Sequence, residues 1–330
     1  MKLALSLVIL FLAVKANADF GPTDIDVDGH YAYVVSEGSG HLEVFNVSDP
    51  QNPVKAGVIH VGLRPSAVRV SGSRAYVVNR GSHNLQVVDI ADPQNLRIVS
   101  SVPVGLYPTG VCAVGSEVYV TSAGSSALQL FNFSEDRRQN MLGYVRVDRN
   151  SDSETSVLLD VVGQYVYVTS GDSRTLQIYK NSDFLRNLVF ISATATGGIP
   201  TAVYAYGQNV FVANRGTNLL QIFNVSNPQN PVLAGSATTF VAPSAVAVSG
   251  PLAYVTSFHS NALQVFSIAN PAQPVMMNWV STDTGPMALD ISGNYAYVAN
   301  WESHTLQVFY LPDSLRSQLS PQWVGSVKTD

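Results

Sequence analysis

The chain contains 330 residues, of which 46% are hydrophobic and 12% are charged, and its formal net charge is −5. A chain of this length and composition can bury a large core, which excludes an intrinsically disordered or fibrous protein. The basic residues form no run anywhere in the sequence, so we expect neither nucleic acid nor an anionic lipid surface among its partners.

Residues 1–18 have the pattern of a secretory signal peptide. A lysine precedes twelve mostly apolar residues, 3–14, and small residues at 16–18 would allow cleavage before Asp19. Twelve residues are too few to cross a hydrocarbon core of ~30 Å as a helix, and no other long apolar run follows. We therefore predict a secreted, periplasmic or cell-surface protein without a transmembrane segment. A retained N-terminal anchor is the alternative, because Lys15 lies in the cleavage region.

Cys112 is the only cysteine, so no intramolecular disulfide can form. Its apolar neighbours indicate a small buried hydrophobic residue. Removal of the signal peptide also removes Lys2 and Lys15, which leaves 16 basic and 23 acidic residues and a formal charge of −7. The mature protein must therefore depend on its core for stability.

One short pattern recurs seven times after the signal peptide. It consists of leucine, then Gln or Glu, then two mostly apolar residues, and it begins at Leu42, Leu85, Leu128, Leu176, Leu220, Leu263 and Leu306. The spacings are 43, 43, 48, 44, 43 and 43 residues. A period of this length without a helical signal predicts a propeller, because each repeat is one small sheet that cannot bury both of its faces alone.

The second repeat shows four strands, which we name A to D. They are PSAVRV (65–70), RAYVVN (74–79), LQVVDI (85–90) and LRIVSSVPV (96–104), separated by turns rich in Gly, Asn, Asp and Pro. Apolar residues on both faces of each strand are typical of a sheet that is covered on either side. We predict an all-β fold, a seven-bladed β-propeller of four-stranded antiparallel blades that forms one domain over 19–330.

The repeated motifs LQVFxVxxPxxP, AYVxN and P-x-x-V-x-V-x-G resemble those of the LVIVD-repeat and YVTN-type β-propellers. The resemblance covers about residues 22–328. It implies a secreted or surface propeller without a shared activity, although some propellers of similar build are lactonases or carry metals. The proline turn after strand C is lost in blades 3 and 4 and altered in blade 7.

The ends of the repeat array predict how the ring closes. The first repeat starts with a strand A at Pro22, and the last repeat ends with a strand D at 322–328. Each blade is then built from consecutive strands, so we expect no exchange of strands between the first and last blades.

The B–C turns and the links from strand D to the next strand A should share one end of the propeller, which we name the B–C/D–A face. Six residues of these loops are candidate ligand-binding residues: Arg64, Arg80, Tyr107, Arg215, His259 and Trp301. Arginine forks bind carboxylates and aromatic rings stack on flat faces, so this set suits an anionic or sugar-like ligand. Turn geometry and simple solvation are the alternative explanation.

A second set occupies the position three residues before the glycine that ends each strand A. Its members are Asp26, Arg69, Cys112, Asp160, Tyr204, Ala247 and Asp290, with Asp26, Arg69, Asp160, Tyr204 and Asp290 forming a candidate polar ring in the channel. Buried charges must be paired or bound to a metal. An ion-pair network that holds the inner strands together is therefore expected, and a cation site or a catalytic site is the alternative.

Five extra residues before blade 4 create a candidate metal loop. Asp148, Asn150, Asp152 and Glu154 place oxygen atoms at alternate positions, as a calcium loop does. The loop lacks the sharp-turn glycine, and Leu159 stands where the final carboxylate would be, so a solvated acidic loop is the other interpretation. Calcium is the one cofactor that the sequence leaves open.

Catalytic motifs are missing from the sequence. It contains no G-x-S-x-G and no H-E-x-x-H, and its six histidines are scattered. We therefore expect a binding module that engages a protein, a glycan or a small ligand on the B–C/D–A face. The alternative is a lactonase-like hydrolase, with a metal held by the channel residues Asp26, Asp160 and Asp290.

Overall fold

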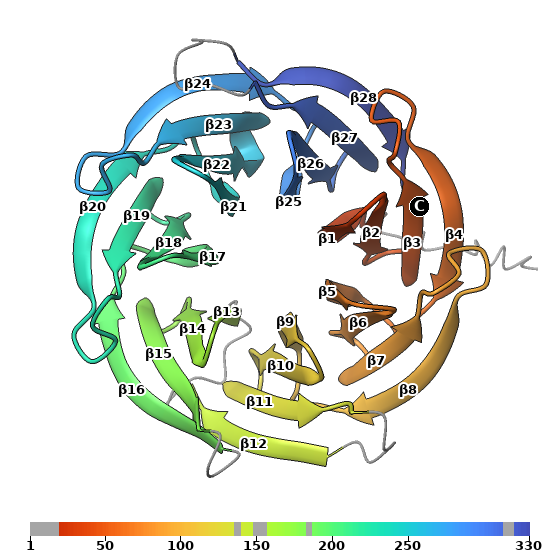
Figure 1. Cartoon of the computed structure of the whole chain (residues 1–330), viewed down its shortest axis with the longest axis horizontal. Helices are drawn as coiled ribbons and strands as arrows, with labels where there is room; N and C mark the ends of the chain where they lie inside the picture. Colours follow the sequence, from red (N-terminus) through yellow and green to blue (C-terminus); the bar gives the residue numbers. More distant parts are fainter. Residues whose placement is uncertain (1–19, 135–139, 148–156, 183–186, 313–319) are drawn as a thin grey trace, which may run out of the picture.

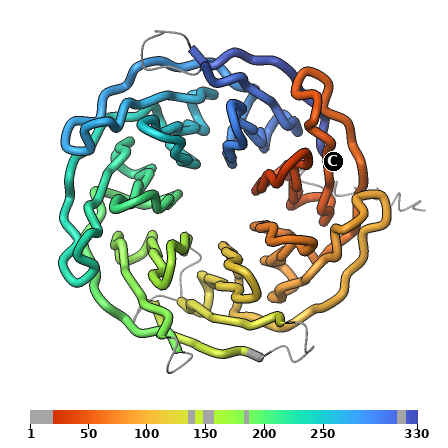
Figure 2. Tube along the Cα trace, viewed as in Figure 1, coloured from red at the N-terminus to blue at the C-terminus, as the bar shows by residue number. Residues whose placement is uncertain are grey.

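A computed structural model describes residues 20–134, 140–147, 157–182, 187–312 and 320–330. These residues form seven four-stranded antiparallel sheets arranged as blades around a central channel (Figure 1). In each blade the first strand lies innermost and the fourth lies on the outer edge, as the chain trace also shows (Figure 2). The predicted seven-bladed propeller is thus confirmed.

The strands follow the chain in order. Blades 1 to 3 contain β1 (Pro22–Asp28), β2 (Tyr31–Ser36), β3 (His41–Asn46) and β4 (Val54–His60); β5 (Pro65–Ser71), β6 (Arg74–Asn79), β7 (Asn84–Asp89) and β8 (Arg97–Pro103); and β9 (Pro108–Val114), β10 (Glu117–Ser122), β11 (Ala127–Asn132) and β12 (Asn140–Arg146). Blades 4 and 5 contain β13 (Val157–Val162), β14 (Tyr165–Ser170), β15 (Thr175–Ser182) and β16 (Asn187–Ala195); and β17 (Pro200–Tyr206), β18 (Asn209–Asn214), β19 (Leu219–Asn224) and β20 (Val232–Thr238). Blades 6 and 7 contain β21 (Pro243–Ser249), β22 (Leu252–Ser257), β23 (Ala262–Ser267) and β24 (Val275–Ser281); and β25 (Pro286–Ser292), β26 (Tyr295–Asn300), β27 (Thr305–Tyr310) and β28 (Gln322–Lys328).

The observed strands of the second blade agree with the predicted ranges to within one residue at each end. A short 3₁₀ turn, η1 (Phe258–Ser260), lies in the B–C turn of blade 6. No helix in the described part of the chain is long and apolar enough to span a membrane.

The core lies between the blades. One cluster packs Tyr33 and Val35 of blade 1 against Val68 and Val77 of blade 2, and similar clusters fill the other junctions. The middle strands are therefore buried on both faces, as the apolar residues on both sides of each strand indicated. Every A–B hairpin turns on a glycine with positive φ, for example Gly72 at φ 59, which an L side chain rarely adopts.

The ring closes without exchange of strands. Blade 7 is complete with its own β25 to β28, and β1 pairs only with β2 inside blade 1, which confirms the predicted closure. The last strand is followed by Asp330, whose backbone N–H donates to Glu43 Oε2 at 3.0 Å. Lys55 forms ion pairs with both Glu43 and Asp330. Packing and this charged contact together hold blade 7 to blade 1.

Candidate functional site

The central channel contains a cavity of about 690 Å³ at its B–C/D–A end. The inner strands of all seven blades line its walls, and loop residues form its mouth. The predicted rim residues Arg64, Arg80, Arg215 and Trp301 lie at this mouth, whereas Tyr107 and His259 lie behind it and contact lining residues. The two groups of residues singled out from the sequence thus meet at one cavity.

Two kinds of hydrogen bond join neighbouring inner strands around the channel. In the first kind, which we name the hydroxyl joint, a Ser or Thr near the start of strand A donates to the first residue of the next blade's inner strand. The five hydroxyl joints are Thr23 to Pro65 O (3.0 Å), Ser66 to Pro108 O (2.8 Å), Thr109 to Val157 O (2.5 Å), Thr201 to Pro243 O (2.6 Å) and Ser244 to Pro286 O (2.6 Å).

Blades 4 and 7 carry Leu158 and Met287 at the hydroxyl position, and there a second kind of contact, the carboxylate joint, takes over. Asp160 Oδ2 accepts from Ala205 N at 2.7 Å, which joins blade 4 to blade 5. Asp290 Oδ2 accepts from Val27 N at 2.7 Å and joins blade 7 to blade 1. These two aspartates therefore have a structural task.

Blades 1 and 2 are joined by both kinds of contact. Asp26 Oδ2 accepts from Val70 N at 2.6 Å, and Asp24 Oδ2 accepts from Val68 N at 3.0 Å. Asp24 also forms the ion pair with Arg69, with 2.9 Å between Asp24 Oδ2 and Arg69 Nη1. The predicted ion-pair network exists, but the direct partner of Arg69 is Asp24. Asp24 was not among the predicted channel residues, and its alternation with Asp26 along β1 is the signal in the sequence that could have identified it.

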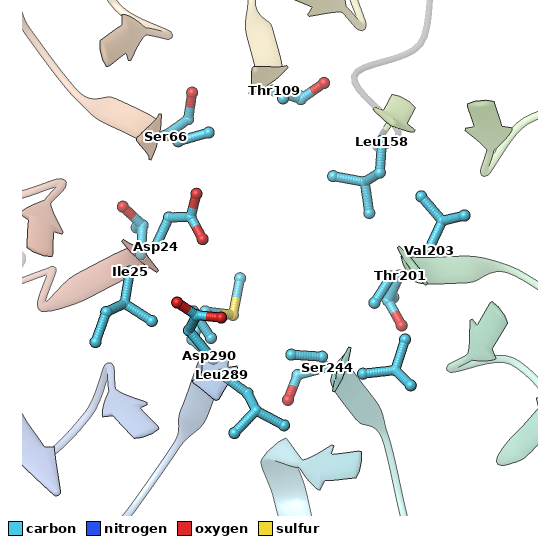
Figure 3. A pocket seen from close by; sticks show the side chains of 18 of the residues that line it. Asp24, Ile25, Ser66, Thr109, Leu158, Thr201, Val203, Ser244, Leu289 and Asp290 are labelled. Atoms are coloured by element: carbon cyan, nitrogen blue, oxygen red, sulfur yellow. The ribbon is translucent and has the colours of Figure 1, made fainter. Parts of the chain in front are cut away.

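Asp160 lies in blade 4, but Asp24, Asp26, Arg69 and Asp290 belong to the consecutive blades 7, 1 and 2 and lie on one side of the channel. Figure 3 shows Asp24 and Asp290 on that side, whereas the apolar side chains of Leu158 and Val203 face the channel on the opposite side. Burial raises the pKa of Asp26 to about 7, against the attraction of Arg69 and with a further increase from Asp290. Burial also raises the pKa of Asp290 and of Asp160, although backbone N–H donors oppose the shift.

The other positions of the predicted polar ring carry no obvious reactivity. Tyr204 lines the cavity, and burial raises its pKa to about 12. Burial, reinforced by the charge of Asp160, raises the pKa of the Cys112 thiol to about 12, so this sulfur stays protonated near neutral pH.

The channel aspartates do not assemble into a metal site. Among the described residues, no group of three His, Cys, Asp or Glu side chains lies close enough to hold a metal ion. Asp26, Asp160 and Asp290, which were considered as a shared metal site, instead each accept a hydrogen bond from the amide of a different neighbouring blade. The candidate calcium residues Asp148, Asn150, Asp152 and Glu154 lie outside the described residues.

The mouth of the cavity is an arc of aromatic and cationic side chains. Trp301 lies 5.4 Å from the ring of Phe20 and 6.2 Å from that of Phe258. The Arg64 guanidinium lies over Phe20 at 5.9 Å and pairs with Glu37 at 2.5 Å. Phe20 was missed in the sequence because it directly follows the predicted signal region and belongs to no repeated motif.

Two further contacts extend this arc. Arg215 Nη2 lies 3.2 Å from His259 Nε2, and the Arg80 guanidinium lies over Tyr107 at 5.6 Å. No ion pair of Arg215 with a carboxylate is found within the described residues. Arg215 is therefore an exposed cation at the cavity that has no carboxylate partner in the part of the chain that the structure describes.

Part of the rim chemistry serves the loops themselves. His83 Nδ1 accepts from Tyr107 N at 3.1 Å, and Asn218 and Asn261 make the same bond to Ala242 and Gly285 in later links. The turn explanation thus holds for His83, whose side chain supports the neighbouring link. Arg64 and Tyr107 adopt φ of 52° and 51°, and Ala242 and Gly285 at the same position of later links also have positive φ, so this conformation belongs to the link itself.

Comparison with solved structures shows the propeller fold. Hydrazine synthase from Kuenenia stuttgartiensis matches with a TM-score of 0.73 at 16% identity, covering 92% of this chain and 99% of that one. A candidate 6-phosphogluconolactonase from Bacteroides fragilis matches with a TM-score of 0.74 at 14% identity, covering 95% and 96%. A functionally unknown protein from Desulfotomaculum acetoxidans gives 0.72 at 14%, covering 92% and 100%. At these identities the similarity concerns the fold alone.

Sequence comparison is more specific. No curated protein matches this chain. The LVIVD repeat matches residues 22–60, 65–104, 197–239, 243–282 and 287–304, which lie in blades 1, 2, 5, 6 and 7 and amount to more than half of the chain. The protein therefore belongs to the LVIVD-repeat family of β-propellers.

Proposed function

We propose that this propeller is a secreted binding module whose ligand occupies the mouth of the central channel on the B–C/D–A face. The observation that carries the proposal is the division of roles in the cavity. Each of the channel carboxylates accepts a hydrogen bond from a backbone N–H of the next blade, as seen at Asp26, Asp160 and Asp290. Arg215 at the mouth, in contrast, has no acidic partner within the described residues. The carboxylates of the channel wall therefore hold the blades together, and the arginine at the mouth is available to bind an anionic group.

Thermal unfolding in the presence of ligands tests this proposal. Sugars, carboxylates and phosphorylated sugars that bind the native protein raise its melting temperature by mass action. We expect the shift to disappear in Arg215→Ala and to persist in Arg97→Ala. Arg97 is an exposed arginine on outer strand β8 that pairs with Asp89, so it controls for the loss of one surface charge. Equal shifts in both variants would exclude the mouth as the site.

Secretion belongs to the same proposal and has its own test. The apolar segment 3–14 followed by small residues at 16–18 supports cleavage after Ala18. The intact mass of the protein recovered outside the cytoplasm should correspond to a chain that starts at Asp19. Recovery of the uncleaved chain with the membrane fraction would favour the anchor.

A lactonase-like hydrolase is the second candidate, and the pKa of Asp26 favours it. A carboxyl group with a pKa raised to about 7 inside an open cavity suits general-base chemistry near neutral pH. A hydrolase of this kind should cleave simple lactones with a rate that rises through pH 7, and Asp26→Asn should abolish turnover while preserving the fold. Absence of turnover in the wild-type protein across a lactone panel would remove this candidate.

Calcium binding remains a proposal for the insertion that contains Asp148, Asn150, Asp152 and Glu154. Alternating oxygen side chains support it. A calcium-dependent rise in melting temperature that is lost in Asp152→Ala would establish the site, and an unchanged melting temperature in calcium and in chelator would refute it.

A further inference from the structure

The links from strand D to the next strand A project large apolar side chains from the B–C/D–A face. Leu63, Leu106 and Val241 occupy the same position in three of these links and are 64%, 52% and 53% exposed. Ile199, in a fourth link, is 41% exposed. They come from the links that enter blades 2, 3, 5 and 6, on the same face of the propeller as the cavity mouth, so apolar and cationic side chains share this face.

The backbone of these links is held in place by hydrogen bonds. The backbone N–H groups of Leu63, Leu106 and Val241 donate to the hydroxyls of Ser82, Ser125 and Ser260, at 2.7, 2.7 and 3.0 Å. Each serine comes from the B–C turn of the following blade. The exposed side chains are thus displayed on a backbone fixed from two blades, which reduces the entropy that binding would remove.

The composition of this surface distinguishes between classes of partner. Exposed Leu, Ile and Val around Trp301, Tyr107 and arginines match the core of a protein interface, where aromatic residues and Arg are enriched. Aromatic rings and arginines alone would also suit a sugar, but aliphatic side chains add little to sugar binding. The aliphatic side chains of the links also lie outside the cavity that would enclose a small ligand.

The charge at the mouth then selects the partner's chemistry. Arg215 and Arg80 line the cavity from blades 5 and 2, and Arg215 has no carboxylate partner within the described residues. An acidic side chain that reaches the mouth would complete the pair, while its apolar neighbours cover the link residues.

We infer that the B–C/D–A face binds a peptide segment of a protein partner, with an Asp or Glu side chain inserted at the channel mouth beside Arg215 and apolar residues placed on Leu63, Leu106 and Val241. This inference rests on the proposed binding function and specifies its ligand.

A display library of random twelve-residue peptides, selected on the wild-type protein, tests the inference. We expect the enriched sequences to carry an acidic residue between apolar residues. The affinity of one enriched peptide is then measured by fluorescence anisotropy against variants. Arg215→Glu and Leu106→Asp should each weaken binding about tenfold or more, because the first reverses the charge and the second removes apolar contact. Replacing the acidic residue of the peptide by its amide should have a similar effect.

Two variants serve as matched controls. Arg97→Glu reverses a charge on outer strand β8, and Val275→Asp changes a residue that is 59% exposed on outer strand β24. Both should bind the peptide within about twofold of the wild type, since surface changes away from the contact have small effects. The Arg215→Lys variant keeps the positive charge but loses the paired N–H donors of the guanidinium, so it should bind the peptide with intermediate affinity.

Three outcomes overturn the inference: no enriched peptide, enriched peptides without an acidic residue, or equal binding to wild type and Arg215→Glu. If small sugars or carboxylates still give an Arg215-dependent thermal shift, the binding function stands and only the peptide class is wrong. If neither peptides nor small ligands depend on Arg215, both proposals fall together.

Discussion

The two kinds of joint between inner strands perform one task with different chemistry. The hydroxyl joints, such as Ser66 to Pro108 O, connect neutral groups. The carboxylate joints at Asp160 and Asp290 use groups that can ionise. They occur in the two blades where Leu158 and Met287 replace the Ser or Thr of the hydroxyl joint. The comparison teaches that a propeller tolerates the loss of one polar contact when a neighbouring position supplies another, at the cost of dependence on pH.

Loss of the one cation in the carboxylate network should have the largest effect. Arg69→Ala leaves Asp24 and Asp26 without their countercharge in the channel wall. The loss of a buried ion-pair partner costs roughly 3 kcal/mol, and somewhat less here because 38% of the Arg69 side chain remains exposed to the channel. Urea denaturation measures the change. Unchanged stability together with lost ligand binding would instead make Arg69 a ligand residue.

Removal of a carboxylate joint should come next. Asp160→Ala leaves the N–H groups of Ala205 and Val161 without their acceptor at a junction that has no hydroxyl joint. An unpaired buried donor costs about 1 to 3 kcal/mol, so the midpoint of urea unfolding should fall. Asp160→Asn keeps one acceptor oxygen and serves as the control, with a smaller loss expected. Equal stability of the wild type and the Ala variant would show that the joint does not support the ring.

The pH dependence of stability sharpens the comparison further. The pKa of Asp26 is raised to about 7 in the folded protein, so the native state favours the protonated carboxyl. The stability that this protonation contributes is complete below about pH 4 and is lost as the pH rises through 7. Asp26→Asn removes this dependence and should be more stable than the wild type by about 1 to 2 kcal/mol at pH 8, but not at pH 4. Thermal unfolding across this range measures the difference, and a constant difference would contradict the assignment.

The smallest effect should come from a single hydroxyl joint. Ser66→Ala removes one neutral hydrogen bond, worth about 1 kcal/mol or less, from a position that also contacts Val78 O. The loss should be the same at pH 5 and pH 8, since no ionisable group is involved. A loss that changed with pH would show that the two kinds of joint are coupled.

The fold could be predicted from the sequence because every blade repeats the same local signals. Strand C carries a leucine every 43 to 48 residues, and the glycine after strand A marks a hairpin that needs positive φ, as at Gly72. Closure without strand exchange also followed from where the first strand A and the last strand D lie.

The site was only partly predictable. Asp26, Arg69 and Asp290 could be identified as an ionic cluster from blade order, but Asp24 as the direct partner of Arg69 depends on side-chain direction. The apolar residues of the links were not noticed, because an isolated Leu63 or Val241 in a loop has no pattern until the ring brings the links together. Residues from distant blades meet only through closure, which no local signal describes.

Ring closure without strand exchange has a consequence for how such a chain can be rearranged. Since each blade is one uninterrupted segment, a cut in any D–A link leaves every sheet intact. A circular permutant that starts at Val241, in the link between β20 and β21, and joins the original ends through a short linker should fold, with the old seam now an ordinary link. By the same logic, an in-frame duplication of about 43 residues adds a whole blade and no orphan strand. Recombination between repeats can therefore change the number of blades in a gene without ever producing an unpaired sheet edge inside the ring.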